Sequence, residues 1–266
     1  MRRSWVLWCL AILLTLASAW WQRTSGPTYP VRGTITIGGQ AYPVTLDRSH
    51  GGAGDQPVRV VVADPEVRGD VVWRRFPTDD PWQVLPMARR GDVLETALPH
   101  QPPAGKLEYE VRLSRGSEQV AFPERAAVTR FKGDVSPWIL APHVIAMFLS
   151  MLMSSRAGLA ALVGLDARRH AWVAIVLLVV GGFVFGPAVQ KQAFGEWWAG
   201  VPFGWDLTDN KTLVAGIAWL VAAVGMRGGR PARGAIVFAA VTTLVVFMIP
   251  HSVWGSQIDW SKQGIP

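Results

Sequence analysis

Hydrophobic residues gather in long blocks at both ends of the chain, and a stretch in which polar and apolar residues alternate separates them. Each C-terminal block is close to the ~20 apolar residues that a helix needs to cross ~30 Å of hydrocarbon. The pattern therefore predicts an α-helical membrane bundle of four C-terminal spans and one N-terminal helix. The four predicted spans are residues 137–155, 172–189, 211–226 and 234–250.

The N-terminal block has two interpretations. Arg2 and Arg3 precede an apolar run that ends in Ala17-Ser18-Ala19, which is the build of a cleavable signal peptide. The run also extends to Trp21, which makes it long enough for a tilted anchor with interfacial tryptophans. Residues 1–22 are thus an anchor or a signal peptide, and both interpretations predict export of the region that follows.

The middle region, residues 26–133, predicts an exported all-β domain. Short alternating runs are separated by turn residues at intervals of roughly 8–12 positions, as in a sandwich. The segments 71–76 and 106–111 resemble paired strands of immunoglobulin-like or fibronectin-like modules. The expected fold is an immunoglobulin-like sandwich, with strands at 31–37, 42–46, 58–63, 71–76, 84–87, 93–97, 107–113 and 119–122.

Arginines indicate the direction of the helices. The net charge of +7 does not form a basic stripe, so nucleic-acid binding is excluded; instead arginines cluster in the loops 156–170 and 227–233. Such loops face the cytoplasm. We therefore expect a bacterial-type cytoplasmic membrane protein in contact with membrane lipid. The β domain, the loop 190–211 and the C-terminal tail of the membrane domain 136–266 would face the periplasm.

No catalytic constellation is visible, and whether the protein is an enzyme stays open, with a non-catalytic role as the simpler interpretation. The single cysteine, Cys9, excludes an intramolecular disulfide and a cysteine metal site. The acids of the β domain are scattered, and its histidines His50 and His100 stand apart in the sequence. Paired intramembrane aspartates, H-E-x-x-H and a serine elbow are absent from the sequence.

The loop between the second and third C-terminal spans is rich in aromatic residues, with Trp197, Trp198 and Trp205 close to Asp206. Several indoles beside a membrane form an interfacial belt or a flat platform for a planar ligand. The density of Gly, Pro and Asp in this loop favours the platform over an interfacial belt alone, because a belt needs no such loop. Thr208, Asp209 or Asn210 would serve as the N-cap of the following span, and Glu196 and Lys211 would pair at the surface.

This loop resembles the tryptophan-rich haem-handling segment of the cytochrome c assembly membrane proteins. The matching residues are Phe194-Gly195-Glu196-Trp197-Trp198, then Trp205-Asp206, then Thr212, with Trp219 further along the helix. Their order is preserved, and the spacing between Trp198 and Thr212 is longer. The resemblance implies haem as cofactor, the tryptophans as platform and Asp206 as an orienting residue or propionate partner.

Two histidines fit the same implication. In the resembled family, histidines at the outer helix ends hold haem iron from both sides, and His143 and His251 occupy such places. Neutral imidazole is a good axial ligand for haem iron. Interfacial placement of His251 and local bonding of His143 are the simpler alternatives. His170 falls in the cytoplasmic loop.

Two functions follow from the sequence. The first is haem binding or handling at the outer face through these histidines and the tryptophan-rich loop. The second is a non-catalytic accessory or structural subunit of a larger membrane electron-transfer complex, in which the sandwich docks a periplasmic or membrane protein partner. A transporter finds little support, because the spans carry few ionisable residues and no inverted repeat.

Overall fold

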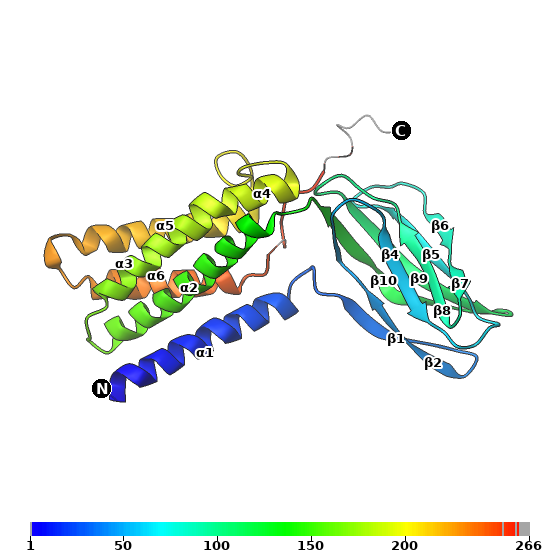
Figure 1. Cartoon of the computed structure of the whole chain (residues 1–266), viewed down its shortest axis with the longest axis horizontal. Coiled ribbons are helices and arrows are strands. Elements are labelled where there is room, and N and C mark those ends of the chain that lie inside the picture. The colour runs from blue at the N-terminus through cyan, green and yellow to red at the C-terminus, as the bar shows by residue number, and fades with distance from the viewer. Residues whose placement is uncertain (1, 252, 259, 261–266) are drawn as a thin grey trace. The chain divides into compact units, whose positions relative to one another are not determined.

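The structure is a computed structural model that describes residues 2–251, 253–258 and 260, and the chain divides into two compact units. The helical unit comprises Met1–Pro27 and Val135–Ser256. The β unit comprises Thr28–Asp134 and the segment from Gln257 onward. The β unit is therefore an insertion between the first helix and the remaining helices (Figure 1).

The helical unit follows the predicted order of one N-terminal helix and a C-terminal bundle. The span predicted at 172–189 is broken into an α-helix, a π-helical turn and a second α-helix. The elements are α1 (Arg2–Thr24), α2 (Pro137–Leu162), α3 (Arg168–Leu178), η1 (Val179–Phe185), α4 (Gly186–Phe194), α5 (Leu207–Gly225), η2 (Arg227–Gly229) and α6 (Arg233–Met248).

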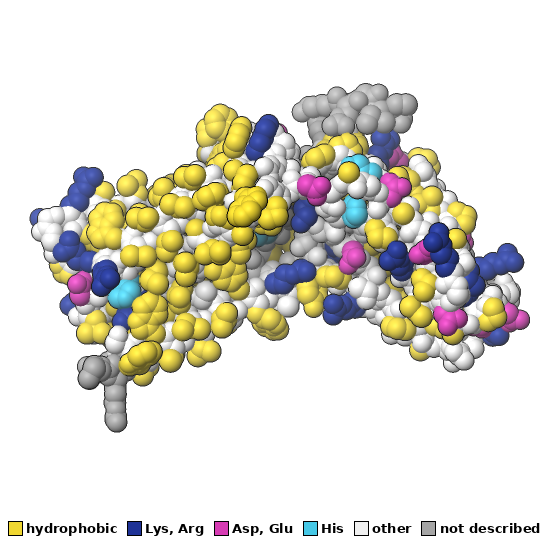
Figure 2. Space-filling view, viewed as in Figure 1, with side chains coloured by type: hydrophobic (Ala, Val, Ile, Leu, Met, Phe, Trp, Pro, Cys, Tyr) yellow, Lys and Arg dark blue, Asp and Glu magenta, His cyan; other side chains and the backbone are white. Residues whose placement is uncertain are grey.

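Four stretches of these helices are long and apolar enough to cross a membrane: Ser4–Thr24, Pro137–Leu162, Arg168–Phe194 and Leu207–Gly225. Hydrophobic side chains cover the visible face of the helical unit (Figure 2). The expected fifth span is shorter than predicted, because α6 has 16 residues and ends at Met248. Ile249, which precedes Pro250, has an extended backbone (φ −70°, ψ 121°), as the residue before a proline usually does.

Small residues form the centre of the bundle. Ala157, Ala215 and Ala239 are fully buried in the same hydrophobic cluster as Trp219. Such small residues permit the close helix approach typical of membrane bundles. The helix α1 lies along α2 and α6 (Figure 1). Its buried residues recur at intervals of three or four positions on one face: Leu7, Ala11, Thr15 and Ser18.

The π-helical turn η1 has a local cause. Pro187 lacks the N–H that would bond one turn back, and the backbone N–H of Gly186 instead reaches the carbonyl of Gly181, five residues earlier. The wider turn places Gly181 and Gly182 against α2 and α5, where a Cβ on Gly181 would lie 2.9 Å from Cβ of Ala146. Turns of this kind occur often at functional sites.

The described residues of the β unit form ten strands, and most coincide with the predicted ones to within a few residues. Two strands of three residues each, β3 and β7, were not predicted because so short a run shows no alternation. The strands are β1 (Val31–Ile37), β2 (Gln40–Leu46), β3 (Ser49–Gly51), β4 (Gln56–Val61), β5 (Arg68–Arg75), β6 (Gln83–Pro86), β7 (Ala88–Arg90), β8 (Val93–Leu98), β9 (Lys106–Arg115) and β10 (Glu118–Lys132).

The strands form open sheets of the orders β1-β2, β3-β10-β9-β5-β6 and β4-β8-β7. The predicted pairing of 71–76 with 106–111 is confirmed, since β5 and β9 are antiparallel neighbours with Trp73 opposite Tyr109. Inward residues of all three sheets, among them Ile35, Val60 and Leu113, share one hydrophobic core. The alternation read from the sequence is thus the burial pattern of these strands.

Candidate functional site: a cavity with two histidines

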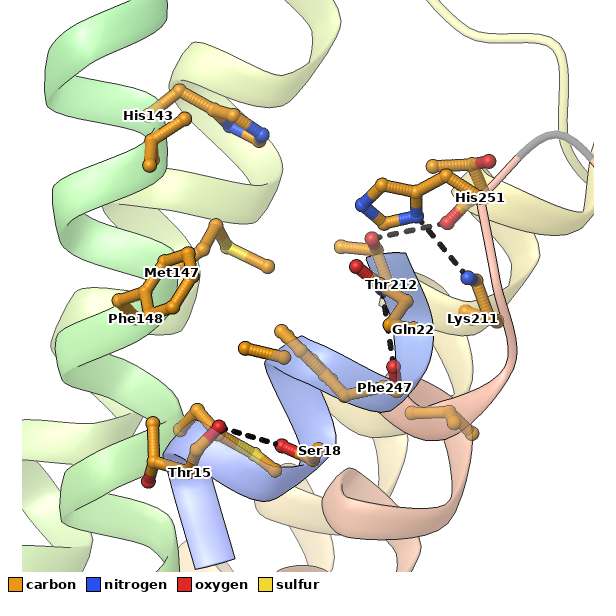
Figure 3. Close-up of a pocket in the computed structure, with 15 residues that line it drawn as sticks. Thr15, Ser18, Gln22, His143, Met147, Phe148, Lys211, Thr212, Phe247 and His251 are labelled. Carbon is orange, nitrogen blue, oxygen red and sulfur yellow. Dashed lines mark hydrogen bonds between the residues drawn. The ribbon is translucent and has the colours of Figure 1, made fainter. Parts of the chain in front are cut away.

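A cavity opens among α1, α2, α5, the end of α6 and His251 beyond it, all within the helical unit (Figure 3). Its empty space is about 760 Å³, part of it open to solvent. Most of the wall area is apolar, although eight of the fifteen lining residues have polar side chains. The lining residues are Thr15, Ser18, Ala19, Gln22, His143, Val144, Met147, Phe148, Met151, Thr208, Lys211, Thr212, Val246, Phe247 and His251.

The half-buried His143 enters the cavity from α2. Its Nδ1 lies 2.8 Å from the carbonyl oxygen of Gly181, the same oxygen that accepts from Gly186 in the π-helical turn. A carbonyl can only accept, so Nδ1 carries the proton and donates it. The Nε2 of His143 therefore holds a lone pair, and the ring points into the cavity (Figure 3).

His251 faces His143 from the other side of the cavity (Figure 3). Its Nδ1 lies 3.3 Å from Nζ of Lys211, which also donates to the carbonyl oxygen of Ile249 over 2.7 Å. An ammonium can only donate, so Nδ1 of His251 is the acceptor and its Nε2 carries the proton. The two rings thus offer the cavity one acceptor and one donor.

Lys211 is the cavity residue that the sequence interpretation misplaced. The expectation of a surface pair with Glu196 is wrong: Lys211 is only 6% exposed and its Nζ contacts Ile249 and His251. The signal in the sequence was a lysine in the first turns of an apolar helix, since ionisable residues at membrane depth are usually functional.

Asp206 is the N-cap of α5, in place of the expected Thr208, Asp209 or Asn210. Its Oδ1 accepts from the backbone N–H groups of Thr208 and Asp209, and Oδ2 accepts from the N–H and hydroxyl of Ser256. Burial alone would raise the pKa of Asp206, but these hydrogen bonds outweigh it and lower the pKa below the usual 3.8. The charged carboxylate ties α5 to the segment after α6.

The tryptophan-rich loop is folded back on the start of α5. Asp209 Oδ2 accepts from the N–H of Ala199 over 2.6 Å, and Asn210 Oδ1 accepts from the N–H of Val201 over 2.8 Å. Trp198 stacks on Phe183 with ring centroids 6.1 Å apart. The polar residues that favoured a ligand-binding loop therefore hold the loop's own backbone.

The two histidines line the cavity, and the three tryptophans do not. Trp197 is 60% exposed and Trp205 is 85% exposed, and neither they nor Trp198 are among the residues that line the cavity. Asp206 also lies outside that lining. Of the residues matched to the haem-handling segment, Thr212 is the one that reaches the cavity, while Trp219 is buried and donates to the Thr243 hydroxyl.

Three further histidines lie elsewhere. His170 contacts Trp8 edge-on at 5.6 Å and is not part of the cavity lining. His50 and His100, which stand apart in the sequence, are brought together in the β unit. Both hydrogen-bond to the carbonyl oxygen of Gly54, and no group of three metal-ligating side chains occurs among the described residues.

Fold and cavity together define a class: a multi-span membrane protein that carries a β domain and has, among its helices, a cavity lined by two histidines and a lysine. Comparison with known proteins narrows the class no further. No protein-family model matches the sequence, and neither a curated protein nor a solved structure is significantly similar to it.

Proposed function

We propose that this protein binds haem in the cavity of its helical unit, with His143 and His251 as the iron ligands. One observation carries the proposal: two imidazoles from separate segments point toward one another across a mostly apolar cavity (Figure 3). Imidazole is a common axial ligand, and an apolar wall suits a macrocycle. A haem-handling role also agrees with the resemblance of the neighbouring loop.

The residues present fit such a group in different degrees. His143 fits as it stands, because ligating histidines usually donate their second ring N–H to a carbonyl or carboxylate, as Nδ1 does to Gly181. His251 fits once Lys211 has released its Nδ1, since Nε2 must lose its proton to ligate. Met147, Phe148 and Phe247 supply apolar contact area. Bound haem would supply electron-transfer chemistry or would itself be passed on, and the chain would bind, orient and shield it.

We propose a separate part for Trp197, Trp198 and Trp205. They form an aromatic platform beside the cavity rather than in its wall, on the loop that ends at Asp206 just before the cavity residue Thr208. Exposed indoles next to an apolar bundle suit the membrane interface and also a flat ligand on its way to the cavity. Loss of these rings would slow haem uptake without changing the iron ligands.

Absorption spectroscopy tests the proposal. The full-length protein, purified in detergent and titrated with haem, should show a Soret band distinct from that of free haem. The band should shift in His143→Ala and His251→Ala, and the double variant should give only the free-haem spectrum. His170→Ala is the matched control, because this histidine lies outside the cavity. A bound-haem Soret band unchanged in the double variant, or only the free-haem spectrum in the wild type, would overturn the proposal.

We further propose that the membrane is a bacterial-type cytoplasmic membrane, with the β unit, an immunoglobulin-like sandwich, and the cavity on the periplasmic side. Arg168 and Arg169 at the start of α3 and Arg227 and Arg230 between α5 and α6 support this direction. Cys9 is the single cysteine, so Cys9→Ser gives a background for labelling. Gly39→Cys in the β unit should react with an impermeant maleimide in intact cells, and Arg230→Cys should not. The reverse result would refute the orientation.

An accessory-subunit function remains the second candidate, and exposed aromatic side chains in the tryptophan-rich loop favour it. Phe203 is 81% exposed and Trp205 is 85% exposed, as expected of a surface that contacts lipid or another protein. This function predicts a stoichiometric complex in mild detergent that Phe203→Ser disrupts while the Soret band stays absent. A monodisperse monomer would contradict it.

A further inference from the structure

We infer that Lys211 binds a carboxylate of the molecule that occupies the cavity, so that the natural ligand is an amphipathic acid with an apolar body. The inference deepens the proposed function, because haem is one such molecule, and it names a recognition residue that the sequence interpretation had left at the surface. It rests on the surroundings of one nitrogen atom.

The ammonium of Lys211 is short of partners. Two of its three N–H donors are used, one by the carbonyl of Ile249 and one by His251. No carboxylate of the described residues lies within ion-pair distance of Nζ. Asp206 attracts the charge from a distance, but both of its carboxylate oxygens already accept bonds from other groups. One donor and most of the charge are left to the cavity.

A buried ammonium without a counter-charge is unfavourable even after the protein relaxes. Lys211 is only 6% exposed near the end of a membrane helix, so burial of its charge is unfavourable in this way. A carboxylate in the cavity would supply the missing charge and a strong hydrogen bond. The cavity has a polar side and an apolar side that match the two parts of an amphipathic acid. Lys211, Thr208 and Thr212 lie on α5, and the apolar Met147 and Phe148 lie on α2.

Carboxylate binding would also change His251. When Nζ of Lys211 turns to the carboxylate, Nδ1 of His251 loses its donor, and the neutral ring can hold its proton on Nδ1 and present a free Nε2. Lys211 would then couple recognition of the acidic group to the readiness of His251 as a metal ligand. The lysine acts on the metal only through the histidine, so it is a positioning residue in that step.

Paired ligands that differ in their carboxylates alone test the inference. Binding to full-length protein in detergent is measured by tryptophan quenching for metal-free protoporphyrin IX and its dimethyl ester, and by competition for a long-chain fatty acid and its methyl ester. The wild type should bind at least one free acid about ten-fold or more tightly than its ester. Preference for the porphyrin or for the fatty acid then identifies the source of the carboxylate.

Variants assign the preference to one side chain. Lys211→Met should lose the preference for the acid, and Lys211→Arg should keep it. Lys191→Met is the matched control, because Lys191 is exposed and bonds the carbonyl of Gly195. Equal binding of both acids and both esters by the wild type, or a preference that survives in Lys211→Met, would overturn the inference. The wild-type comparison decides even if a variant fails to fold.

The same measurements keep the two proposals apart. A histidine-dependent Soret band with equal binding of haem and haem dimethyl ester removes the role of Lys211 and leaves haem binding intact. A Lys211-dependent preference for protoporphyrin IX or the fatty acid, without a Soret band on haem titration, removes haem and leaves the acid site intact. In haem-loaded protein, Lys211→Met should also change the spin state of the iron, which a merely structural lysine would not do.

Discussion

The Nε2 group of Gln22 donates a hydrogen bond to the carbonyl oxygen of Phe247 over 3.1 Å. It fastens the end of α1 to the end of α6, although 225 positions separate the two residues. Ser18 and Thr15, one and two turns earlier, are buried and face the cavity. The first helix is therefore a wall of the site as well as a hydrophobic segment.

Retention of α1 is the first prediction. Cleavage after Ala19 would remove Thr15 and Ser18 from the cavity wall and expose the small residues of α2 behind them, so we expect the mature protein to keep the helix. Intact-mass measurement of membrane-extracted protein checks this, and a chain that starts at Trp20 would contradict it. Gln22→Ala should lower stability by about 1 kcal/mol, the usual net contribution of one hydrogen bond.

Elements whose evidence is local in the sequence were predicted well. The strand β1 has its predicted bounds, and α2 begins at the predicted Pro137, because alternation and proline position act over a few residues. The length of β10 was underestimated, since its pairing with β9 shifts register between Phe122 and Ala127. A bulge breaks the alternation that the sequence pattern needs.

Acid should weaken the tie between α5 and the segment after α6. The pKa of Asp206 is lower in the folded protein than its usual 3.8, so its stabilisation is fully present above about pH 4 and is lost as the pH falls through the lower, folded value. Asp206→Asn keeps one acceptor but loses the charge. At pH 7 its free energy of unfolding should be about 1–3 kcal/mol lower than that of the wild type. Its melting temperature should be lower accordingly.

The difference between Asp206→Asn and the wild type should narrow as the pH is lowered from 5 to 3. Differential scanning fluorimetry in detergent over this range measures it. Glu196→Gln, an exposed acid of the same loop, should melt like the wild type throughout. A gap for Asp206→Asn that stays constant down to pH 3 would show that the carboxylate charge does not matter.

Close packing of α2 on α6 gives a prediction with a built-in control. A Cβ on Gly158 would lie 2.6 Å from Cβ of Ala240, whereas a Cβ on Gly234 would meet nothing within 4 Å. Gly158→Ala should therefore destabilise the bundle by roughly 1–3 kcal/mol, the usual penalty of overpacking. Gly234→Ala should be neutral or stabilising by up to ~1 kcal/mol, because alanine favours helix more than glycine does.

Thermal melting of the two glycine variants side by side measures this contrast. Equal melting temperatures would mean that the two helices separate easily at this point and that the small-residue contact contributes little.

The candidate site was predicted in part, for a reason that lies in its contacts. His143 and His251 are 108 positions apart and were paired by topology, which a pattern of hydrophobic blocks determines. The burial of Lys211 depends on the path of the chain after α6, where Ile249 and His251 approach it. Nothing local in the sequence reveals that path, so the lysine looked like a surface residue.

The final prediction concerns a buried polar network in the β unit. Gln56 is 1% exposed; its Nε2 donates to the carbonyl of Asp47 over 3.1 Å, and its Oε1 accepts from the fully buried hydroxyl of Thr129 over 2.7 Å. Tyr109 donates to the same carbonyl over 2.7 Å. Burial, followed by nearby Asp47, raises the pKa of Tyr109, so its hydroxyl stays a donor at ordinary pH. Gln56→Leu would leave the Thr129 hydroxyl without this acceptor and should cost about 1–3 kcal/mol.

A double-mutant cycle separates this cost from simple loss of packing. Thr129→Val removes the stranded hydroxyl, so the double variant with Gln56→Leu should be more stable than the sum of the two single changes predicts, by about 0.5 kcal/mol or more. The full-length wild type, the two single variants and the double variant are unfolded with denaturant. Protease resistance of the β unit is the readout for each. Strict additivity would mean that the two side chains contribute independently, and that the β unit tolerates an unpaired hydroxyl in its core.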